Sequence, residues 1–428
     1  MPRFPTRRRF LQTSAGTLAL PLLAPSLQAE EPKTSPNQRI NLGFIGVGTM
    51  GRGHLGGFLG MADVQVVAVC DVVKERREDA RKRVETKYGK DVKGDFKGCA
   101  EYTDFRQLLE HKDLDAVVIA TPDHWHTIPC ILAARAKKHI YCEKPLTQNI
   151  AEGRRLVSEI EKSKITFQVG SQQRSEFGNH FRLAVELVRN GRIGKIKTIN
   201  IGVGDPNKPC DLPTQDVPPG TDWDMWVGPA PARGYNEILC PKGIHTHFPA
   251  WRNYREYAGG GVADMGAHHF DIAQWALGMD TSGPVEIIPP EDPKAMRGLK
   301  FIYANGIEMV HGGNVDCEFI GEKGVIRASR KGITSDPAEI VTTPIGEKEF
   351  HVYASNNHKR NWIECLRTSK PTICPAETGH RTATVCHLGN LGYQLRRKLK
   401  WDPVKEEFVG DAEANKLTTR EPREKWKI

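Results

Sequence analysis

The segment that most constrains the fold of this chain is Gly46-Val47-Gly48-Thr49-Met50-Gly51, which directly follows the apolar run Ile40 to Ile45. Between a strand and a helix, the first glycine of a G-x-G-x-x-G pattern allows a tight turn, and the second lets the backbone approach a pyrophosphate. The third lets the helix pack closely on the strand. The pattern predicts a Rossmann-type α/β domain that binds a dinucleotide. The predicted contacts are Gly46, Gly48, Thr49, Met50 and Gly51.

An acidic residue follows the second predicted strand at the distance that such a domain requires. The run Val64 to Cys70 is apolar and ends at Asp71, which lies about 20 residues after Gly51. A carboxylate there accepts hydrogen bonds from ribose hydroxyls and repels a 2′-phosphate. We therefore predict that Asp71 binds the cofactor and that the cofactor is NAD rather than NADP.

Two further strand-like runs end in polar residues. Ala116 to Ala120 leads into T-P-D-H-W-H, and His139 to Cys142 leads into Glu143-Lys144-Pro145. Ligands bind at the carboxyl ends of parallel strands in open α/β sheets. We expect cofactor contacts from Thr121, Pro122, His124, His126, Glu143 and Lys144. The alternative for the two histidines is a structural role at the start of a helix.

Lys144 is also a candidate catalytic and substrate-binding residue. Its position at a strand end, fixed by the following proline, can present an ammonium group to a substrate oxygen. A fixed positive charge there stabilises negative charge that develops on that oxygen.

The pattern changes after the predicted strand Ile165 to Gly170. Gln172 and Arg174 carry donors suited to substrate hydroxyls, although a polar hinge explains them equally well. Long β-like runs then predict an α+β domain with a large, mainly antiparallel open sheet. Near the end, Asn357 to Arg367 and Thr378 to Leu395 read as amphipathic helices that pack back across the molecule.

The stretch Gly259 to Asp271 brings titratable side chains close to three glycines. On one helix, Asp264, His268 and Asp271 would share a face. Histidine suits a base for a hydroxyl proton, and Asp264 is placed to orient its ring. The glycines would leave room for a sugar ring. We predict Asp264 and His268 as catalytic residues, with His268 also contacting substrate. The alternative is that Asp264 caps the helix and His268 is a satisfied interface residue.

A histidine-rich segment precedes this stretch. Trp251 could stack on a sugar face, and Arg252 could bind hydroxyls or an acid group, so both are predicted to bind substrate. His245 and His247 lie on one side of a strand, and with Asp264 or His268 they form a rival metal site. We predict no metal, since the ten cysteines also lack the spacing of a zinc site.

Basic residues are concentrated in short runs near the two ends, Arg3 to Arg9 and Arg396 to Lys400, and no basic stripe interleaved with aromatics appears, so the net charge of +9 does not predict a nucleic-acid partner. Thr6 to Gln12 contains three consecutive arginines, and the short apolar run Leu18 to Ala24 follows. This layout is typical of a twin-arginine (Tat) export signal. We therefore expect the Tat export machinery as a partner and a periplasmic or membrane-tethered protein.

The 428 residues are enough for two domains. The expected division is a signal peptide at 1–29, a linker at 30–39, the nucleotide domain at 40–170, the second domain at 171–400 and a tail at 401–428.

Taken in order, the glycine turn, the T-P-D-H-W-H segment, Glu143-Lys144-Pro145 and the Asp264/His268 pair resemble the Gfo/Idh/MocA oxidoreductase family. With the export signal, the chain resembles an exported, inositol dehydrogenase-like branch. The resemblance implies that Lys144 contacts the hydroxyl undergoing oxidation and that His268 is the acid/base, accompanied by Asp264. It also implies a cis Lys144-Pro145 bond and a dimer or tetramer.

These observations lead to a primary hypothesis and two alternatives. The first is an NAD(P)-dependent dehydrogenase or reductase that acts on a CH–OH group of a sugar, sugar derivative or cyclitol, with the cofactor tightly bound because a periplasm has no free NAD pool. The second is a redox-neutral glycoside lyase or hydrolase that oxidises its substrate transiently. The third is an NAD-binding scaffold without activity.

Overall fold

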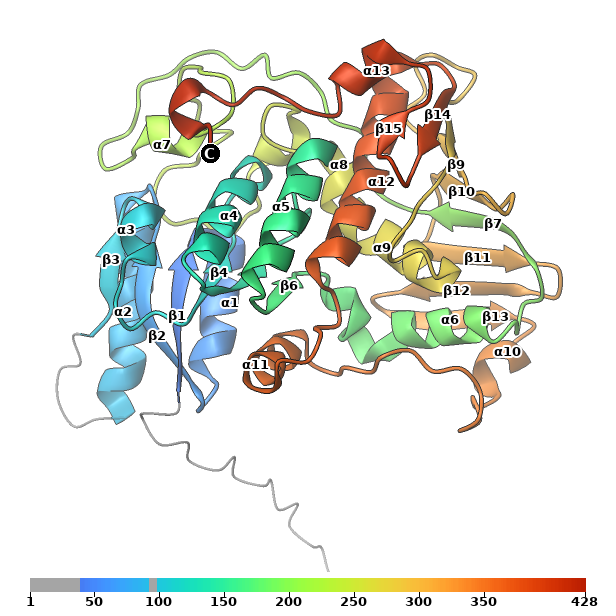
Figure 1. Cartoon of the computed structure of the whole chain (residues 1–428), viewed down its shortest axis with the longest axis horizontal. Coiled ribbons are helices and arrows are strands. Elements are labelled where there is room, and N and C mark those ends of the chain that lie inside the picture. The colour runs from blue at the N-terminus through green and yellow to red at the C-terminus, as the bar shows by residue number, and fades with distance from the viewer. Residues whose placement is uncertain (1–38, 92–97) are drawn as a thin grey trace, which may run out of the picture.

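The computed structural model describes residues 39–91 and 98–428, so the expected signal peptide and nearly all of the linker lie outside the described residues. Within these residues, the first domain holds a six-stranded sheet in the order β3-β2-β1-β4-β5-β6 (Figure 1). Its strands are β1 (Ile40–Ile45), β2 (Val64–Cys70), β3 (Ala100–Tyr102), β4 (Ala116–Ile119), β5 (His139–Cys142) and β6 (Phe167–Val169). Its helices are α1 (Thr49–Leu59), α2 (Lys74–Asp91), α3 (Phe105–Leu109), α4 (Thr127–Arg135) and α5 (Ile150–Ser163).

All pairings in this sheet are parallel. Its strands are apolar runs because helices cover both faces, and β4 is buried throughout. The order of the strands reverses between β1 and β4, which opens a crevice at their carboxyl ends. The predicted Rossmann domain is therefore confirmed. β3 was not predicted, because three residues are too short to produce a recognisable pattern.

The second domain is built on a mixed sheet that the described residues extend to nine strands, in the order β13-β12-β11-β7-β10-β9-β8-β14-β15. The strands are β7 (Ile196–Ile201), β8 (Glu286–Ile288), β9 (Lys300–Ile302), β10 (Glu308–His311), β11 (Cys317–Gly321), β12 (Val325–Ser329), β13 (Gly332–Asp336), β14 (Leu399–Asp402) and β15 (Glu407–Phe408). Only the β7/β10 pair among these is parallel. The predicted, mainly antiparallel sheet is thus confirmed, although β13, β14 and β15 were missed.

Helices cover one face of this second sheet. Phe181 and Phe270 share one buried apolar cluster with the sheet residues Ile199 and Phe319. The two aromatic rings come from α6 (His180–Arg189) and α9 (Gly266–Leu277). The remaining helices are α7 (Trp223–Val227), α8 (Gly260–Asp264), α10 (Glu339–Thr342), α11 (His358–Thr368), α12 (Ala376–Leu395) and α13 (Ala412–Lys416).

The long helix α12 lies between the two domains (Figure 1) and packs against both α5 and α9. Its neighbour α11 packs on the first domain, where Trp362 contacts Phe58 and Tyr141. Both helices were predicted to pack back across the molecule, and both do. α12 also supports the second-domain helices directly, because Asn390 donates a hydrogen bond to the Gly259 carbonyl.

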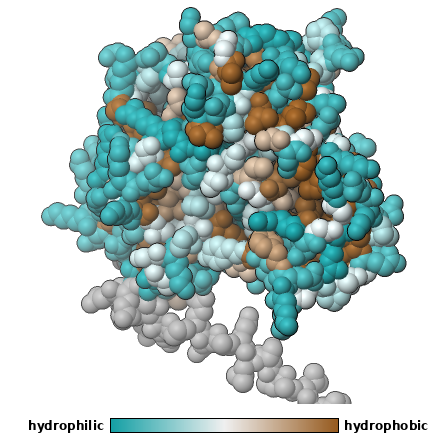
Figure 2. Space-filling view, turned by 45° about the vertical axis from the view of Figure 1, so that its right-hand side comes forward, coloured by the Kyte–Doolittle hydropathy of each residue, from teal (hydrophilic) through white to brown (hydrophobic). Residues whose placement is uncertain are grey.

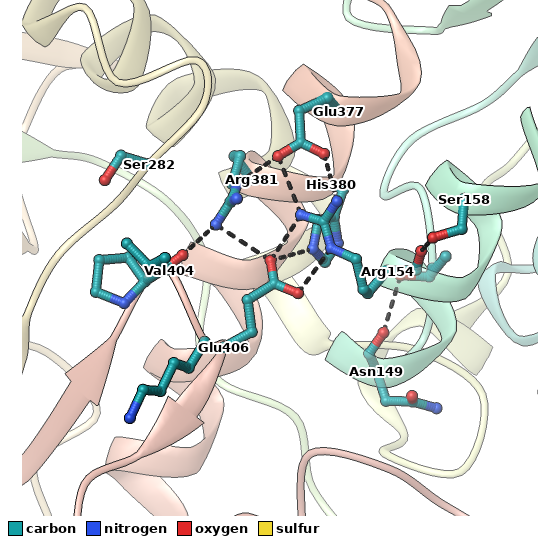
Figure 3. A network of polar contacts seen from close by, with 12 residues as sticks. Asn149, Arg154, Ser158, Ser282, Glu377, His380, Arg381, Val404 and Glu406 are labelled. Atoms are coloured by element: carbon teal, nitrogen blue, oxygen red, sulfur yellow. Dashed lines mark hydrogen bonds and ion pairs between the residues drawn. The ribbon is translucent and has the colours of Figure 1, made fainter. Parts of the chain in front are cut away.

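A charged network fixes α12 in this position (Figure 3). Arg154 of α5 donates to Glu377 of α12 and to Glu406, which precedes β15. The same Glu406 accepts from His380, whose ring is completely buried, and forms an ion pair with Arg381. One carboxylate therefore joins three segments that are distant in sequence.

The segment expected to be a tail, residues 401–428, is instead part of the packed structure. It continues β14, forms β15 and α13, and ends with Trp426 against Trp125 of the first domain, at 4.7 Å between ring centroids. This packing was not predictable from the sequence, because single anchoring residues such as Trp426 produce no periodic pattern.

Figure 2 shows a mainly hydrophilic surface on which apolar residues form separate patches. No helix among the described residues is long and apolar enough to cross a membrane.

Candidate active site

A cavity of about 550 Å³ lies where the domains meet, a size typical of small-molecule and cofactor sites. It collects residues from both domains. The predicted residues that line it are Gly46, Gly48, Thr49, Met50, Asp71, Thr121, Pro122, Glu143, Lys144, Gln172, Trp251, Arg252, Asp264 and His268. Gly51, His124, His126 and Arg174 are not among its lining residues.

The glycine turn fits a dinucleotide. Gly46 has a φ of +83°, and a Cβ there would lie 2.8 Å from the Ala120 backbone. A Cβ on Gly51 would lie 2.1 Å from the Gly46 carbonyl oxygen, so this glycine allows helix packing and does not need to face the cavity. A Cβ on Gly48 would meet nothing within 4 Å. The open space beside Gly48, at the start of α1, suits the pyrophosphate of a nucleotide.

Asp71 lies beside this turn at the end of β2. Its carboxylate accepts 2.9 Å hydrogen bonds from the backbone N–H groups of Val47 and Val73. These bonds fix the carboxylate at the edge of the cavity, where a ribose would lie in a bound dinucleotide.

The histidine-rich segment crosses the cofactor end of the cavity, a role that the sequence did not predict. We call residues 241–249 the strap. Thr49 donates a 2.9 Å hydrogen bond to the His247 carbonyl, and Arg76 donates one of 2.9 Å to the Gly243 carbonyl. Arg52 also donates to the His245 carbonyl. The strap thus spans from the glycine turn to the start of α2.

Lys144 and Asp264 meet inside the cavity. The Lys144 ammonium group donates 2.7 Å hydrogen bonds to both the carboxylate and the backbone carbonyl of Asp264. The Arg252 Nε lies 3.6 Å from the same carboxylate. Burial opposes ionisation of Asp264, but the charges of Lys144 and Arg252 outweigh it and lower its pKa. The Lys144-Pro145 bond is cis, as the family resemblance implied.

His268 lines the cavity near this pair and is buried. Its Nδ1 has no hydrogen-bond partner among the described residues. Burial, together with the positive charges of Lys144 and Arg330, lowers the His268 pKa well below its ordinary value. The imidazole is therefore neutral at pH 7, which is the form that can accept a proton.

The predicted orientation of His268 by Asp264 is wrong for this structure, since no hydrogen bond joins the two side chains in the described chain. The expected single helix is divided, because α8 ends at Asp264 and α9 begins at Gly266. Asp264 is bonded to Lys144 instead. Asp271 is also directed elsewhere, since its carboxylate accepts bonds from Arg174 at 2.7 and 2.8 Å.

The glycines near Asp264 have a different purpose from the one predicted. A Cβ on Gly260 would lie 2.4 Å from the Asn207 nitrogen, and one on Gly261 would lie 2.3 Å from the Gly204 Cα. Neither glycine lines the cavity. They allow close contact between two backbone segments and do not make room for a sugar ring.

Glu143 is fixed by two neighbours at the base of the cavity. Its Oε1 lies 2.6 Å from the His54 Nε2 and accepts a 2.8 Å hydrogen bond from Gln172. Burial favours the neutral acid, but the hydrogen bond and charge of His54 and the charge of Lys144 prevail and lower the Glu143 pKa to about 2. Gln172 thus positions Glu143. His54 is a further lining residue that carried no sequence signal.

The other predicted contacts lie behind the cavity wall. His124 Nε2 lies 3.0 Å from the Trp226 carbonyl, and burial lowers its pKa to about 3. His126 bridges the carbonyls of Pro145 and Thr121. Both histidines therefore have the structural role that was their alternative interpretation. His126 fixes the strand ends from which Lys144 and Thr121 project, and His124 connects the same segment to α7.

The aromatic pair beside Arg252 forms one wall of the cavity. The guanidinium carbon lies 4.2 Å from the Trp251 ring centroid and 5.0 Å from that of Phe248. The rings of His245 and His247 lie with their centroids 4.5 Å apart and their planes tilted by 36°. Among the described residues, however, no group of three or more His, Cys, Asp or Glu side chains is arranged to hold a metal ion.

Comparison with known families decides the assignment. The model of the oxidoreductase family NAD-binding Rossmann fold matches residues 40–171, and that of the family's C-terminal alpha/beta domain matches residues 207–428. The chain belongs to the Gfo/Idh/MocA oxidoreductase family. It is therefore an oxidoreductase whose first domain is the family's NAD-binding domain.

Relatives of this Gfo/Idh/MocA protein include dehydrogenases of cyclitols. Myo-inositol 2-dehydrogenase of Thermotoga maritima is 24% identical over 391 residues, which cover 85% of this chain and 99% of the relative. A glycosyl hydrolase family 109 protein of Shewanella pealeana is 27% identical over 205 residues, 44% of each chain. The structure of scyllo-inositol dehydrogenase from Lactobacillus casei with bound NAD(H) and scyllo-inositol has a similar fold, with a TM-score of 0.54, 17% identity, and coverage of 85% of this chain and 99% of that one.

Asp123 and Arg330 are two further lining residues of this family member that were not predicted from the sequence. Asp123 is 4% exposed, and its carboxyl group makes no hydrogen bond to another described residue. Burial and the charge of Asp264 raise the Asp123 pKa to about 8. Arg330 reaches the cavity from the second domain. Asp123 stood inside a recognised motif, whereas Arg330 lies on a sequence-distant turn that gave no signal.

Proposed function

We propose that this protein transfers a hydride between a secondary alcohol carbon of a sugar, sugar derivative or cyclitol and a tightly bound NAD cofactor. The observation that carries the proposal is the meeting of Lys144, Asp264 and His268 in one cavity with the glycine turn. The bound nicotinamide supplies the hydride acceptor or donor. The residues of the chain bind the substrate, move its proton and stabilise charge on its oxygen.

Lys144 contacts the substrate oxygen in this proposal. Its ammonium group is already fixed by two hydrogen bonds to Asp264, so it needs little rearrangement when the substrate binds. A fixed cation at this point stabilises the negative charge that grows on the oxygen as its hydrogen leaves.

His268 accepts the hydroxyl proton. Burial keeps the ring neutral, and the His268 side chain makes no hydrogen bond to another described residue, so a ring nitrogen remains to accept the proton in the cavity. In the reverse reaction the protonated ring returns that proton to the oxygen.

The cofactor is NAD in this proposal because the fixed Asp71 carboxylate favours free ribose hydroxyls. The cyclitol dehydrogenases among the relatives and similar structures support a substrate that carries several hydroxyl groups.

We also propose that export by the Tat pathway delivers the protein to the periplasm, with the cofactor already loaded. The strap supports retention, because its backbone carbonyls are bonded to three residues around the cofactor end of the cavity. A retained cofactor must be regenerated in place by a second substrate of similar chemistry. Homo-oligomer formation remains part of this proposal.

A redox-neutral lyase or hydrolase reaction is the second candidate. Asp123 favours it, since a carboxyl group that keeps its proton at pH 7 can donate that proton to a leaving group. The partial similarity to a glycosyl hydrolase family 109 protein points in the same direction.

The test uses protein purified from a native-like host. Mass spectrometry of the nucleotide released on denaturation identifies the cofactor, and a panel of sugars and cyclitols is then added to the undenatured protein. Lasting absorbance of reduced nicotinamide supports the dehydrogenase. Release of a sugar without lasting reduction supports the redox-neutral route. Absence of any released nicotinamide nucleotide contradicts cofactor retention.

A further inference from the structure

Arg330 extends into the cavity from the turn between β12 and β13 in the second domain. Its Nε donates a 3.0 Å hydrogen bond to Gln173 Oε1, and its backbone N–H donates one of 3.1 Å to Asp316. Its two terminal nitrogens make no hydrogen bond to described residues, and Arg330 forms no ion pair within them. The free edge of the guanidinium group is therefore available to a ligand in the cavity.

An unusual backbone supports this guanidinium. Its carbon lies 4.7 Å from the Phe177 ring centroid, and Phe177 also lines the cavity. Phe177 has a φ of +59°, and the next two residues, Gly178 and Asn179, have values of +65° and +61°. A bulky residue rarely adopts this left-handed conformation, and such strain is concentrated at functional sites. The strained turn holds the aromatic ring under Arg330.

The charges around Arg330 leave it only partly compensated. Asp316, Asp264 and Glu176 act on it electrostatically, while burial disfavours its charged form. Asp264 is already bonded to Lys144, and Asp316 accepts from the Arg330 backbone. A half-buried guanidinium without a paired carboxylate is costly unless a ligand supplies the anion.

We propose that Arg330 binds the carboxylate of an acidic sugar, so the substrate of this oxidoreductase is a sugar acid such as a uronic or aldonic acid. This inference rests on the proposed function of the same cavity. A carboxylate matches the planar fork of a guanidinium group with two parallel hydrogen bonds.

The bound carboxylate also affects the acid/base residue. Arg330 and Lys144 both act to keep His268 unprotonated. An anion bound to Arg330 offsets part of this positive potential, so the acidic substrate makes His268 a stronger base when it binds. A neutral sugar cannot provide this effect.

The test measures binding to the purified holoprotein by isothermal titration calorimetry. The probes are matched sets with gluco, galacto and manno configuration, each containing the hexose, its uronic acid, its aldonic acid and its 6-phosphate. In at least one set we expect an acid to bind about 10- to 100-fold more tightly than the hexose, as a charge-assisted hydrogen-bond pair predicts. Arg330→Met removes this preference, and Arg330→Lys keeps part of it.

The control is Arg327→Met, on the neighbouring strand, where Arg327 pairs with Glu318 at the surface. This variant keeps the wild-type preference. The inference is overturned if no acid binds more tightly than its hexose, if the 6-phosphate is preferred to both acids, or if the preference survives in a folded Arg330→Met protein. Reduction of the bound cofactor by a neutral sugar would leave the proposed function intact while refuting the acidic substrate.

Discussion

Two charge clusters of this protein look alike in sequence but differ in structure. In the first, Arg174 donates hydrogen bonds to Asp271 and to Asp280 from three nitrogens, and its side chain is 2% exposed. In the second, Lys144 and Arg252 share the carboxylate of Asp264, whose side chain is 31% exposed. Only the second cluster lines the cavity.

The difference shows what separates a structural ion pair from a functional one. The carboxylates around Arg174 occupy its guanidinium group on each side, so little remains to bind a ligand. Lys144 has a third N–H and Arg252 has free nitrogens, both beside open space. Paired charges are common to both clusters, and access to the cavity with unused hydrogen-bonding capacity distinguishes them.

The largest effect, a loss of stability, should come from breaking the first cluster, in which Arg174 binds Asp271 and Asp280. Arg174→Met leaves Asp271 buried without its cation, which costs about 3–5 kcal/mol of folding free energy. Thermal and denaturant unfolding measure the loss. The Arg174→Met/Asp271→Asn double variant should be less destabilised than the sum of the single variants, because both charges leave together. Normal stability in Arg174→Met would mean that this cluster is not structural.

Substitutions in the second cluster, Lys144 with Arg252 and Asp264, should reduce activity rather than stability. Lys144→Met removes the cation that we place on the substrate oxygen, and kcat should fall about 10²- to 10³-fold, as for loss of one oxyanion donor. The unfolding temperature should change less than in Arg174→Met. Steady-state kinetics with the best substrate measures the effect, with Lys138→Met as a control remote from the cavity, since the Lys138 ammonium group bonds only the Leu114 carbonyl among the described residues. Near-normal kcat would exclude Lys144 from the chemistry.

Arg76 offers an intermediate case, because strap carbonyls accept its hydrogen bonds. Arg76→Met removes donors to Gly243 and Pro241, so the strap should hold the cofactor less firmly. We expect bound nucleotide to dissociate about tenfold faster, from the loss of a charge-assisted bond. Dialysis followed by mass spectrometry measures retention. Arg81→Met, at the exposed Glu101 pair on the same helix, is the matched control.

The smallest effect concerns a buried carboxyl without a cation partner of its own. Because the Asp123 pKa is raised to about 8, its proton is present at neutral pH and is lost as the pH rises through that value. The second charge formed beside Asp264 should then lower kcat/KM by up to about tenfold on the alkaline side. Asp123→Asn cannot lose a proton, so its pH–rate profile should lack that alkaline limb. An unchanged pH–rate profile in Asp123→Asn would show that ionisation of Asp123 does not cause the alkaline decrease.

The sequence predicted the first domain closely because its signals are local. The glycines, Asp71 and Lys144 all follow apolar strands, and the parallel sheet brings strand ends to one edge whatever the rest of the chain does. For the second domain, the sequence predicted only the fold class, an α+β domain with a mainly antiparallel sheet. Short strands such as β14 and β15 pair with partners far away in sequence, and no local pattern records that choice.

The predictions for the site were wrong where the direction of a side chain depends on partners that are distant in sequence. Helical spacing put Asp264 with His268, but a lysine from the other domain takes that carboxylate. Arg174 has the donors of a substrate ligand and turns to Asp271 instead. Arg330 was missed because a turn of the second sheet carries it into the cavity.

By itself, the sequence determined that this chain has a dinucleotide-binding domain, a second domain with a mainly antiparallel sheet, and a set of candidate groups for hydride and proton transfer. Only the tertiary structure decided which of those groups share a cavity and which are bonded to other residues inside the protein. The physical reason is that a hydrogen bond has limited donors and acceptors, and the partner that occupies them is set by packing between segments distant in sequence. Asp264 and Asp271 each pair with a cation, but the Asp264 carboxylate borders the cavity, whereas the Asp271 carboxylate is fully buried against Arg174 and Thr382.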